Sequence, residues 1–337
     1  MQELRFRAMG CQMLAVIDRD DGPAGAQLTE VPGWFEEWEQ QLSRFRADSD
    51  LAQLNAAAGR PRVVRPVLWE VIRIALQAAR ESDGLVRPTM LGALEAAGYD
   101  RSFDALDRDS AAAAPASTAR GERRGLWGAR PAPPDWSAIA LDRRTHSVAL
   151  PAGVRLDLGG VAKGWAADRA ARQLAATGPA LVDAGGDIVV SGPMADGSPW
   201  PIAIANPFAP DATVGALLIY FGAVATSGRD YRRWRRGGVE QHHIIDPRTG
   251  QPAETDVLSA TVVAADGPSA EAAAKVALIL GSRDGLAWLD ARPTLAGLLV
   301  LDDGRVLSSR RLGPYLDQTP LPASAASAAP AMAPAGS

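Results

Sequence analysis

The segment from Val154 to Asp187 constrains the fold more than any other, because it places two Gly-Gly turns between apolar runs. Apolar and polar residues alternate from Val154 to Leu158, which predicts a short strand. After Gly159-Gly160, the spacing of apolar residues predicts a helix from Lys163 to Leu174. The run from Ala180 to Gly186 then predicts a second strand that stops at the second glycine turn.

Both glycine turns suit an anionic ligand. Glycine lets backbone N–H groups approach a ligand closely, and the N-terminus of a helix favours an anion. Lys163 and the carboxylates of Asp157 and Asp187 would then face one place. The same pattern is compatible with ordinary turns between helix and strand and with a solvated Lys163. The segment alone therefore leaves a phosphate or nucleotide site and a plain structural role equally open.

Length and composition allow a large core but do not indicate a polyanionic partner. The chain has 337 residues, 47% of them hydrophobic, and can form one large domain or two. Its net charge of −4 gives no indication of nucleic-acid binding. The single cysteine, Cys11, excludes an internal disulfide, and its neighbours Met9 and Met13 favour a buried side chain over a reactive thiol.

Targeting signals are not evident in the sequence. No run of about 18 apolar residues occurs, so no membrane-spanning helix is expected. The first residues show neither a signal peptide nor a lipid-attachment cysteine, which predicts a cytoplasmic location.

Helices and strands are expected in irregular order along the rest of the chain. The hydrophobic pattern predicts helices over 31–45, 66–82 and 269–280. It also predicts a strand pair over 4–17 with a turn or bulge at Met9-Gly10, strands over 200–205, 215–221, 222–228 and 258–264, and a strand over 298–301 that turns at 302–304 into 305–307. The lack of a regular strand–helix–strand rhythm favours the α+β class over a doubly wound sheet. A stretch with few apolar anchors predicts a flexible insertion at about 108–135, and the Ala/Pro/Ser-rich tail at 318–337 is expected to be disordered.

The segment from His242 to Gly250 gathers most of the rare chemical groups of the chain. Zinc binding by His242, His243 and Asp246 is disfavoured, because adjacent histidines on a strand point to opposite faces. One of the two histidines is better suited to face a pocket and carry a proton. A capped β-turn would explain the DPRTG sequence as well.

Taken together, these segments resemble the ApbE-type FAD:protein FMN transferases. The matching motifs occur in the order found in that family: Met9-Gly10, LSRFRADSDLAQLN (42–55), DGLVRPT (83–89), LDLGGVAKGWAAD (156–168), VDAGGD (182–187), ATSG (225–228), HHIIDPRTG (242–250) and SATVVAADGPSAEAAAKVALILG (259–281). The resemblance covers about residues 4–312 and implies one main catalytic domain, 1–312, with an α+β, T-fold-like architecture. It also implies a reaction in which FAD is cleaved, FMN joins a Thr or Ser hydroxyl of a target protein as a phosphoester, and AMP leaves.

The resemblance further implies a set of site residues. His243 is expected to handle the proton or contact the acceptor, and Asp246 to position His243 or the pyrophosphate. Phe45 is expected to stack on a ring system. The expected contacts of FAD are Met9, Phe45, Leu85, Val86, Arg87, Asp157, Lys163, Thr226, Ile245 and Arg248.

The family's magnesium motif is altered in this chain. The family pattern has a helix-borne Asp, a second Asp and a Thr, together with a residue of the glycine turn. The matching positions here are Glu271, Ala274 and Lys275, with Gly160 in the turn. Arg87 is a second departure, at a position where the family usually has Asp.

An ammonium at Lys275 would repel Mg²⁺ and could supply the positive charge itself, unless the side chain lies on a solvated face. Three readings remain: a transferase in which Glu271 still holds Mg²⁺, a transferase in which Lys275 acts in catalysis in place of the ion, and an FAD-binding protein without transfer. An FAD pyrophosphatase that releases FMN and AMP is a further alternative.

Overall fold

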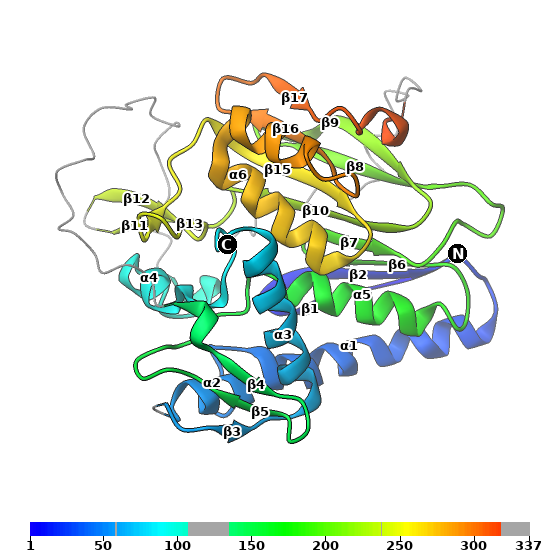
Figure 1. Ribbon diagram of the computed structural model, residues 1–337. Helices are drawn as coiled ribbons and strands as arrows, with labels where there is room; N and C mark the ends of the chain where they lie inside the picture. Colours follow the sequence, from blue (N-terminus) through cyan, green and yellow to red (C-terminus); the bar gives the residue numbers. More distant parts are fainter. Residues whose placement is uncertain (58, 107–134, 237, 318–337) are drawn as a thin grey trace.

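The computed structural model describes residues 1–57, 59–106, 135–236 and 238–317 (Figure 1). The predicted insertion at about 108–135 lies outside these residues except for Asp135, and the predicted tail at 318–337 lies wholly outside them. Within the described ranges, no helix is both long and apolar enough to cross a membrane.

An antiparallel sheet of eight strands forms the centre of the fold (Figure 1). The six residues of its strand β16 are all buried, which is typical of a strand covered on both faces. The predicted α+β class is confirmed. The strand order is β1 (Gln2–Ala8), β2 (Cys11–Ile17), β6 (Ala180–Ala184), β7 (Asp187–Val190), β10 (Gly222–Gly228), β15 (Val257–Ala264), β16 (Ala296–Leu301) and β17 (Val306–Ser308).

Three helices cover one face of this sheet: α1 (Gly22–Leu42), α5 (Ala162–Leu174) and α6 (Gly267–Asp290) (Figure 1). Helix α1 starts earlier than the predicted 31–45 helix and ends before Phe45, because Ser43 takes an extended conformation. Helix α6 likewise continues past the predicted end at residue 280, through a non-helical Gly281 with φ 82°. A fourth helix, α3 (Pro66–Glu81), contacts α1 and α6.

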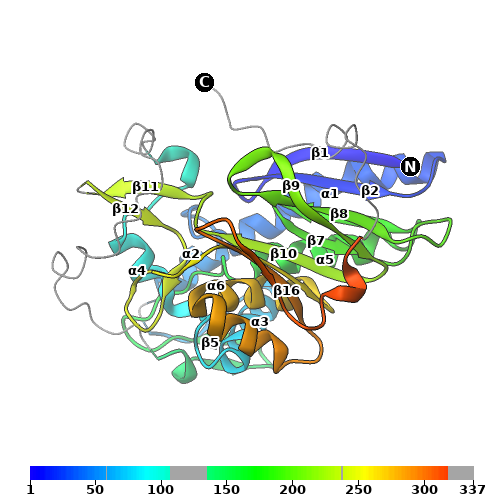
Figure 2. The same ribbon diagram turned by 90° about the horizontal axis from the view of Figure 1, so that it is seen from above.

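A hairpin covers the opposite face of the sheet. Strands β8 (Trp200–Asn206) and β9 (Ala209–Ile219) pair with each other, and their buried residues form one apolar cluster with residues of β2, β6, β7, β10, β15 and β16. Seen from above, β10 and β16 lie between this hairpin and α6 (Figure 2). The central strands are therefore buried from both sides.

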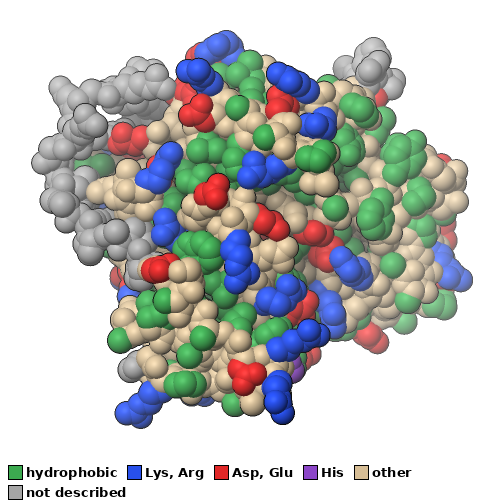
Figure 3. Space-filling model, in the orientation of Figure 1, with side chains coloured by type: hydrophobic (Ala, Val, Ile, Leu, Met, Phe, Trp, Pro, Cys, Tyr) green, Lys and Arg blue, Asp and Glu red, His purple; other side chains and the backbone are tan. Residues whose placement is uncertain are grey.

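Shorter elements complete the described structure. Helix α4 (Leu91–Ala96) and the hairpin of β11 (Arg233–Arg236) and β12 (Val239–His242) lie at one side of the molecule (left in Figures 1 and 2). Met90, Leu94, Trp234 and Ile245 share an apolar cluster there. Acidic and basic side chains are interspersed over the face seen in Figure 3. The remaining bounds are α2 (Asp50–Asn55), β3 (Arg62–Val63), η1 (Pro88–Met90), α4 (Leu91–Ala96), η2 (Phe103–Ala105), η5 (Trp136–Ala138), β4 (Ala140–Asp142), β5 (Ser147–Ala149), β11 (Arg233–Arg236), β12 (Val239–His242), β13 (Ile245–Asp246), β14 (Gln251–Pro252) and η6 (Gly313–Tyr315).

The predicted strand from Val154 to Leu158 is wrong, although its apolar side chains are buried as expected. The side chain of Asn55 takes the place of a neighbouring strand at Leu156. Its Nδ2 donates to the carbonyl oxygen of Leu156 at 2.9 Å, and its Oδ1 accepts from the N–H of Leu156 at 2.7 Å. A side-chain amide thus satisfies the backbone groups that a ladder would otherwise pair.

The N-terminal turns of α5 and α6 meet at two glycines. A Cβ atom on Gly164 would lie 2.6 Å from the carbonyl carbon of Gly267, and one on Gly267 would lie 2.7 Å from the carbonyl carbon of Gly164. No side chain fits between the two backbones. This contact places the residues that flank the glycines close together.

We expect Gly164→Ala to destabilise the protein by about 1–3 kcal/mol, because the added methyl group forces the two helices apart. Urea unfolding followed by circular dichroism measures this change. Gly33→Ala is the matched control: the glycine lies inside helix α1 with no atom within 4 Å of its added Cβ. It is expected to stabilise by about 0.5–1 kcal/mol. Equal unfolding midpoints for Gly164→Ala and the wild type would contradict the close packing.

Candidate active site

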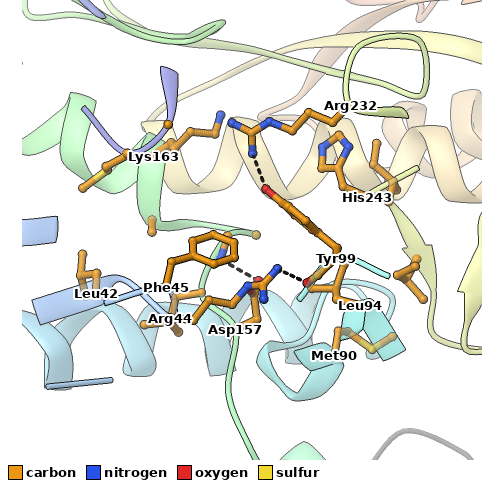
Figure 4. Close-up of a pocket in the computed structure, with 18 of the residues that line it drawn as sticks. Leu42, Arg44, Phe45, Met90, Leu94, Tyr99, Asp157, Lys163, Arg232 and His243 are labelled. Carbon is orange, nitrogen blue, oxygen red and sulfur yellow. Dashed lines mark hydrogen bonds and ion pairs between the residues drawn. The ribbon is translucent and has the colours of Figure 1, made fainter. Parts of the chain in front are cut away.

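A cavity of about 250 Å³ lies beside the N-terminus of α5 (Figure 4). Its walls come from the loop after α1, the loop before η1, the glycine turn before α5, and one side of α6. The structure brings most of the predicted site residues to this cavity. Those that line it are Met9, Phe45, Leu85, Val86, Arg87, Asp157, Gly160, Lys163, His243, Ile245 and Lys275.

Four predicted residues are not among those that line the cavity. Thr226 shares a hydrogen bond of 2.9 Å with the hydroxyl of Thr261 on the next strand. Asp246 is buried and holds Arg248 in an ion pair of 2.7 Å, which closes the turn after β13. Glu271 lies behind the wall, where only 1% of its side chain is exposed.

Lys163 and Asp187 form a buried ion pair at the base of the cavity. Burial opposes the charged form of Lys163, but Asp187 and Glu271 outweigh it and raise the pKa of Lys163 above its ordinary value. Burial raises the pKa of the Asp187 carboxyl to about 6. Lys163 is therefore a permanent cation, as the predicted anion site requires.

The N-terminus of α5 already holds an anion from the protein itself. The Glu271 carboxylate accepts a hydrogen bond from the N–H of Gly164 at 2.9 Å through Oε2. Its other oxygen, Oε1, accepts from Lys275 Nζ at 2.9 Å. Burial works against ionisation of Glu271, but Lys275 and Lys163 lower its pKa below the ordinary value. The sequence predicted an anion at this helix end without indicating that a glutamate supplies it.

His243 is the histidine that lines the cavity. His242, its neighbour, places Nε2 3.2 Å from the carbonyl oxygen of Ala253 and is not among the lining residues. Burial and the positive charge of Arg232 bring the pKa of His243 well below its ordinary value, so the ring is neutral near pH 7. Its Nδ1 is buried without a hydrogen-bond partner among the described residues. A neutral imidazole of this kind can accept a proton.

Arg232 is a site residue that the sequence did not single out. It lies just before β11 and reaches the same side of the cavity as Lys163 and His243 (Figure 4). Its guanidinium donates to Cys11 Sγ at 2.9 Å and to the Tyr99 hydroxyl at 3.4 Å. Neither partner within the described chain is a carboxylate, so this partly buried cation has no opposite charge in contact there. The basic run YRRWRRGG (231–238) was the available signal, but its spacing did not show which arginine turns inward.

Aromatic rings occupy the other side of the cavity (Figure 4). Phe45 is 41% exposed, and its ring centroid lies 5.6 Å from that of Tyr99. The guanidinium of Arg44 lies 4.0 Å from the centre of the Phe45 ring and forms an ion pair of 2.7 Å with Asp157. An exposed ring held in this way offers a face on which a planar ligand can stack.

The residues at the expected magnesium positions do not fit a divalent cation. Lys275 places its ammonium 3.5 Å from the carbonyl oxygen of Gly160 and next to Glu271. The third expected position, Ala274, carries no ligand atom in its side chain. Within the described ranges, no group of three or more His, Cys, Asp or Glu side chains is arranged to hold a metal ion.

Comparisons with known proteins agree on one family. The model of the ApbE family matches residues 9–299. The chain belongs to the ApbE family. An FAD:protein FMN transferase of Treponema pallidum is 34% identical over 321 residues, which cover 89% of this chain and 83% of the relative. One from Vibrio cholerae is 29% identical, with 86% of this chain and 84% of the relative covered.

Solved structures of the ApbE family share the fold. The ApbE protein of Thermotoga maritima superposes with a TM-score of 0.76 at 26% identity, covering 92% of this chain and 97% of that one. The flavin transferase ApbE of Vibrio cholerae gives a TM-score of 0.72 at 26% identity, covering 94% of this chain and 99% of that one.

We expect the ring of His243 to stay neutral between pH 8 and pH 6, because its pKa lies well below the ordinary value of about 6.5. Proton NMR of the imidazole Cε1–H resonances measures this directly, with His243→Gln identifying the signal. A resonance of His243 that titrates at pH 6.5 or above would contradict a neutral, buried ring.

Proposed function

We propose that this chain is an FAD:protein FMN transferase. It would cleave the pyrophosphate of FAD, attach FMN through a phosphoester bond to a Thr or Ser hydroxyl of a target protein, and release AMP. The observation that carries the proposal is one cavity that combines an exposed aromatic ring, the cations Lys163 and Arg232, and a neutral histidine. Membership of the ApbE family supports the same reaction.

In this proposal the two sides of the cavity hold different parts of FAD. The flavin ring stacks on Phe45, near Arg44 and Asp157, and the pyrophosphate lies toward Lys163 and Arg232. Both cations are fixed before the substrate arrives, so they stabilise negative charge on the phosphate oxygens without reorganisation. Leu85, Val86, Met9 and Ile245 supply apolar contacts around the ring.

The transfer itself exchanges the phosphoanhydride bond of FAD for a phosphoester bond to the acceptor. The acceptor hydroxyl oxygen attacks the phosphorus on the FMN side, the bond from that phosphorus to the bridging oxygen breaks, and AMP leaves. His243 takes the proton of the hydroxyl, which its neutral ring allows. Asp246, Arg248 and Thr226 act at a distance from the substrate in this scheme, because each is held by other residues of the protein.

Covalent flavin on an acceptor peptide is the decisive measurement. The purified chain is incubated with FAD and a peptide that carries a Thr in a flavinylation-type sequence, and the products are analysed by mass spectrometry. Peptide carrying FMN, together with free AMP, supports the proposal. Free FMN and AMP without modified peptide would instead identify a pyrophosphatase, and intact bound FAD would identify a binding protein.

His243→Gln should lower the rate of transfer by about 10²- to 10⁴-fold, because the hydroxyl loses its proton acceptor. FAD binding, measured by quenching of flavin fluorescence, should change little. His146→Asn is the matched control, since His146 is not among the cavity residues and its φ of 51° is one that Asn tolerates. Equal rates for the His243 variant and the wild type would remove His243 from the mechanism.

Arg232→Met should weaken FAD binding by about 10- to 100-fold, as expected for the loss of a hydrogen-bonding charge on the phosphates. The dissociation constant from fluorescence quenching measures this effect. Arg235→Met, on the exposed side of the same hairpin, is the control and should leave the constant unchanged. Unchanged affinity in the Arg232 variant would place the pyrophosphate elsewhere.

A further inference from the structure

Lysine is rare in this chain and is confined to the cavity. Of the 35 basic residues only Lys163 and Lys275 are lysines, and every other is arginine. Both line the cavity. A chain that uses arginine at all its other basic positions has a compact ammonium at these two places alone. The choice of side chain there therefore calls for a physical reason.

The surroundings of Lys275 are those of a small cation. Its Nζ lies 2.9 Å from Glu271 Oε1 and 3.5 Å from the carbonyl oxygen of Gly160. A carboxylate and a backbone carbonyl are oxygen ligands of the kind that magnesium prefers. An ammonium is a compact point charge with three donors, whereas the planar fork of a guanidinium would not fill the same position.

The charges around Lys275 balance without a metal ion. Lys163 and Lys275 face Asp187 and Glu271 in two ion pairs, so this group of four is neutral overall. A divalent ion on Glu271 would have to displace Lys275 and would then lie near two ammonium groups. Repulsion between like charges at such short range is large in a buried site.

We propose that the ammonium of Lys275 takes the place of the divalent cation, so that this chain transfers FMN without Mg²⁺. The inference rests on the proposed transferase function for its catalytic part. In the reaction, Lys275 donates hydrogen bonds from Nζ to a phosphate oxygen of FAD while Glu271 and Gly160 hold it in place. The charge it brings is part of the polypeptide and does not depend on the supply of metal.

Direct binding of Mn²⁺, followed by electron paramagnetic resonance, tests the ion site independently of activity. The full chain is titrated with Mn²⁺ with and without FAD, and we expect no bound ion in the wild type. Lys275→Ser frees Glu271 and the Gly160 carbonyl and adds a hydroxyl, so it should gain one bound Mn²⁺. Lys275→Met fills the same volume without a charge or a ligand atom and should gain none.

The same variants give a matched pattern in the transfer assay. Wild-type rates should agree within twofold in EDTA and in Mg²⁺. The transfer rate of Lys275→Met should be at least 100-fold below that of the wild type in both conditions. The transfer rate of Lys275→Ser should be equally low in EDTA and should rise at least tenfold when Mg²⁺ is added. Arg283→Ser removes an exposed cation from the same helix and should behave like the wild type.

The outcomes separate this inference from the proposed function. Two results would contradict the proposal that Lys275 replaces the ion: binding of Mn²⁺ at one site of the wild-type protein, or transfer of FMN in Mg²⁺ but not in EDTA. Neither result would contradict the proposed transferase function. A folded Lys275→Ser variant that binds no Mn²⁺ would also contradict the replacement of the ion, because Glu271 and Gly160 would then not form a cation site. If no variant transfers FMN in any condition but the Lys275→Ser variant alone binds Mn²⁺, the result supports the replacement of the ion by Lys275 and refutes the proposed transferase function.

Discussion

The contact between Gly164 and Gly267 determines the geometry of the cavity. Because neither residue has a side chain, the first turns of α5 and α6 touch through their backbones. Lys163 precedes one glycine, and Glu271 follows the other by one helical turn. The Glu271 carboxylate can then reach across the contact and accept the Gly164 N–H. Any wider spacing of the helices would break that hydrogen bond and separate the charges that depend on it.

Buried charges are the second consequence of this packing. An isolated buried charge is strongly destabilising, and a buried pair is tolerated only when its remaining hydrogen bonds are satisfied. Glu271 meets this condition through one ammonium and one backbone N–H, and Asp187 meets part of it through Lys163. Arg232, which is partly buried, does not, because its hydrogen-bond partners in the described part of the chain are a thiol and a phenol. The positive charge that remains unpaired therefore faces the place where the proposed pyrophosphate would lie.

The sequence predicted the local elements better than the long-range contacts. Periodicity located α3 and α5 closely, and the second glycine turn, Gly185-Gly186, marked the end of β6 correctly. The predicted strand at Val154–Leu158 is wrong because alternating apolar residues indicate burial, not strand pairing. The side chain of Asn55 forms the hydrogen bonds with the Leu156 backbone that a neighbouring strand would otherwise form. Arg232 was missed for a related reason: its role arises from contacts with Cys11 and Tyr99, which are remote in the chain.

The family motifs supplied positions but not orientations. Eleven of the predicted residues line the cavity, whereas Thr226, Asp246, Arg248 and Glu271 do not. Asp246 and Arg248 illustrate the physical limit, since two opposite charges two residues apart pair with each other as readily as with a ligand. Only the fold decides between these arrangements.

A single ammonium carries less charge than a divalent ion, and the number of carboxylates around it is smaller to the same extent. Lys275 supplies one positive charge where Mg²⁺ would supply two, and Glu271 is one carboxylate where the family pattern has two, with Ala274 at the other position. Arg87 lines the same cavity at a position where the family pattern has Asp, and this exchange removes one negative charge and adds one positive charge. Burial lowers the pKa of the Arg87 guanidinium, but its ordinary value is so high that the group stays charged at neutral pH. The magnesium positions therefore keep their net charge when the ion is replaced, and the exchange at Arg87 is the departure that makes the cavity more positive toward a phosphate.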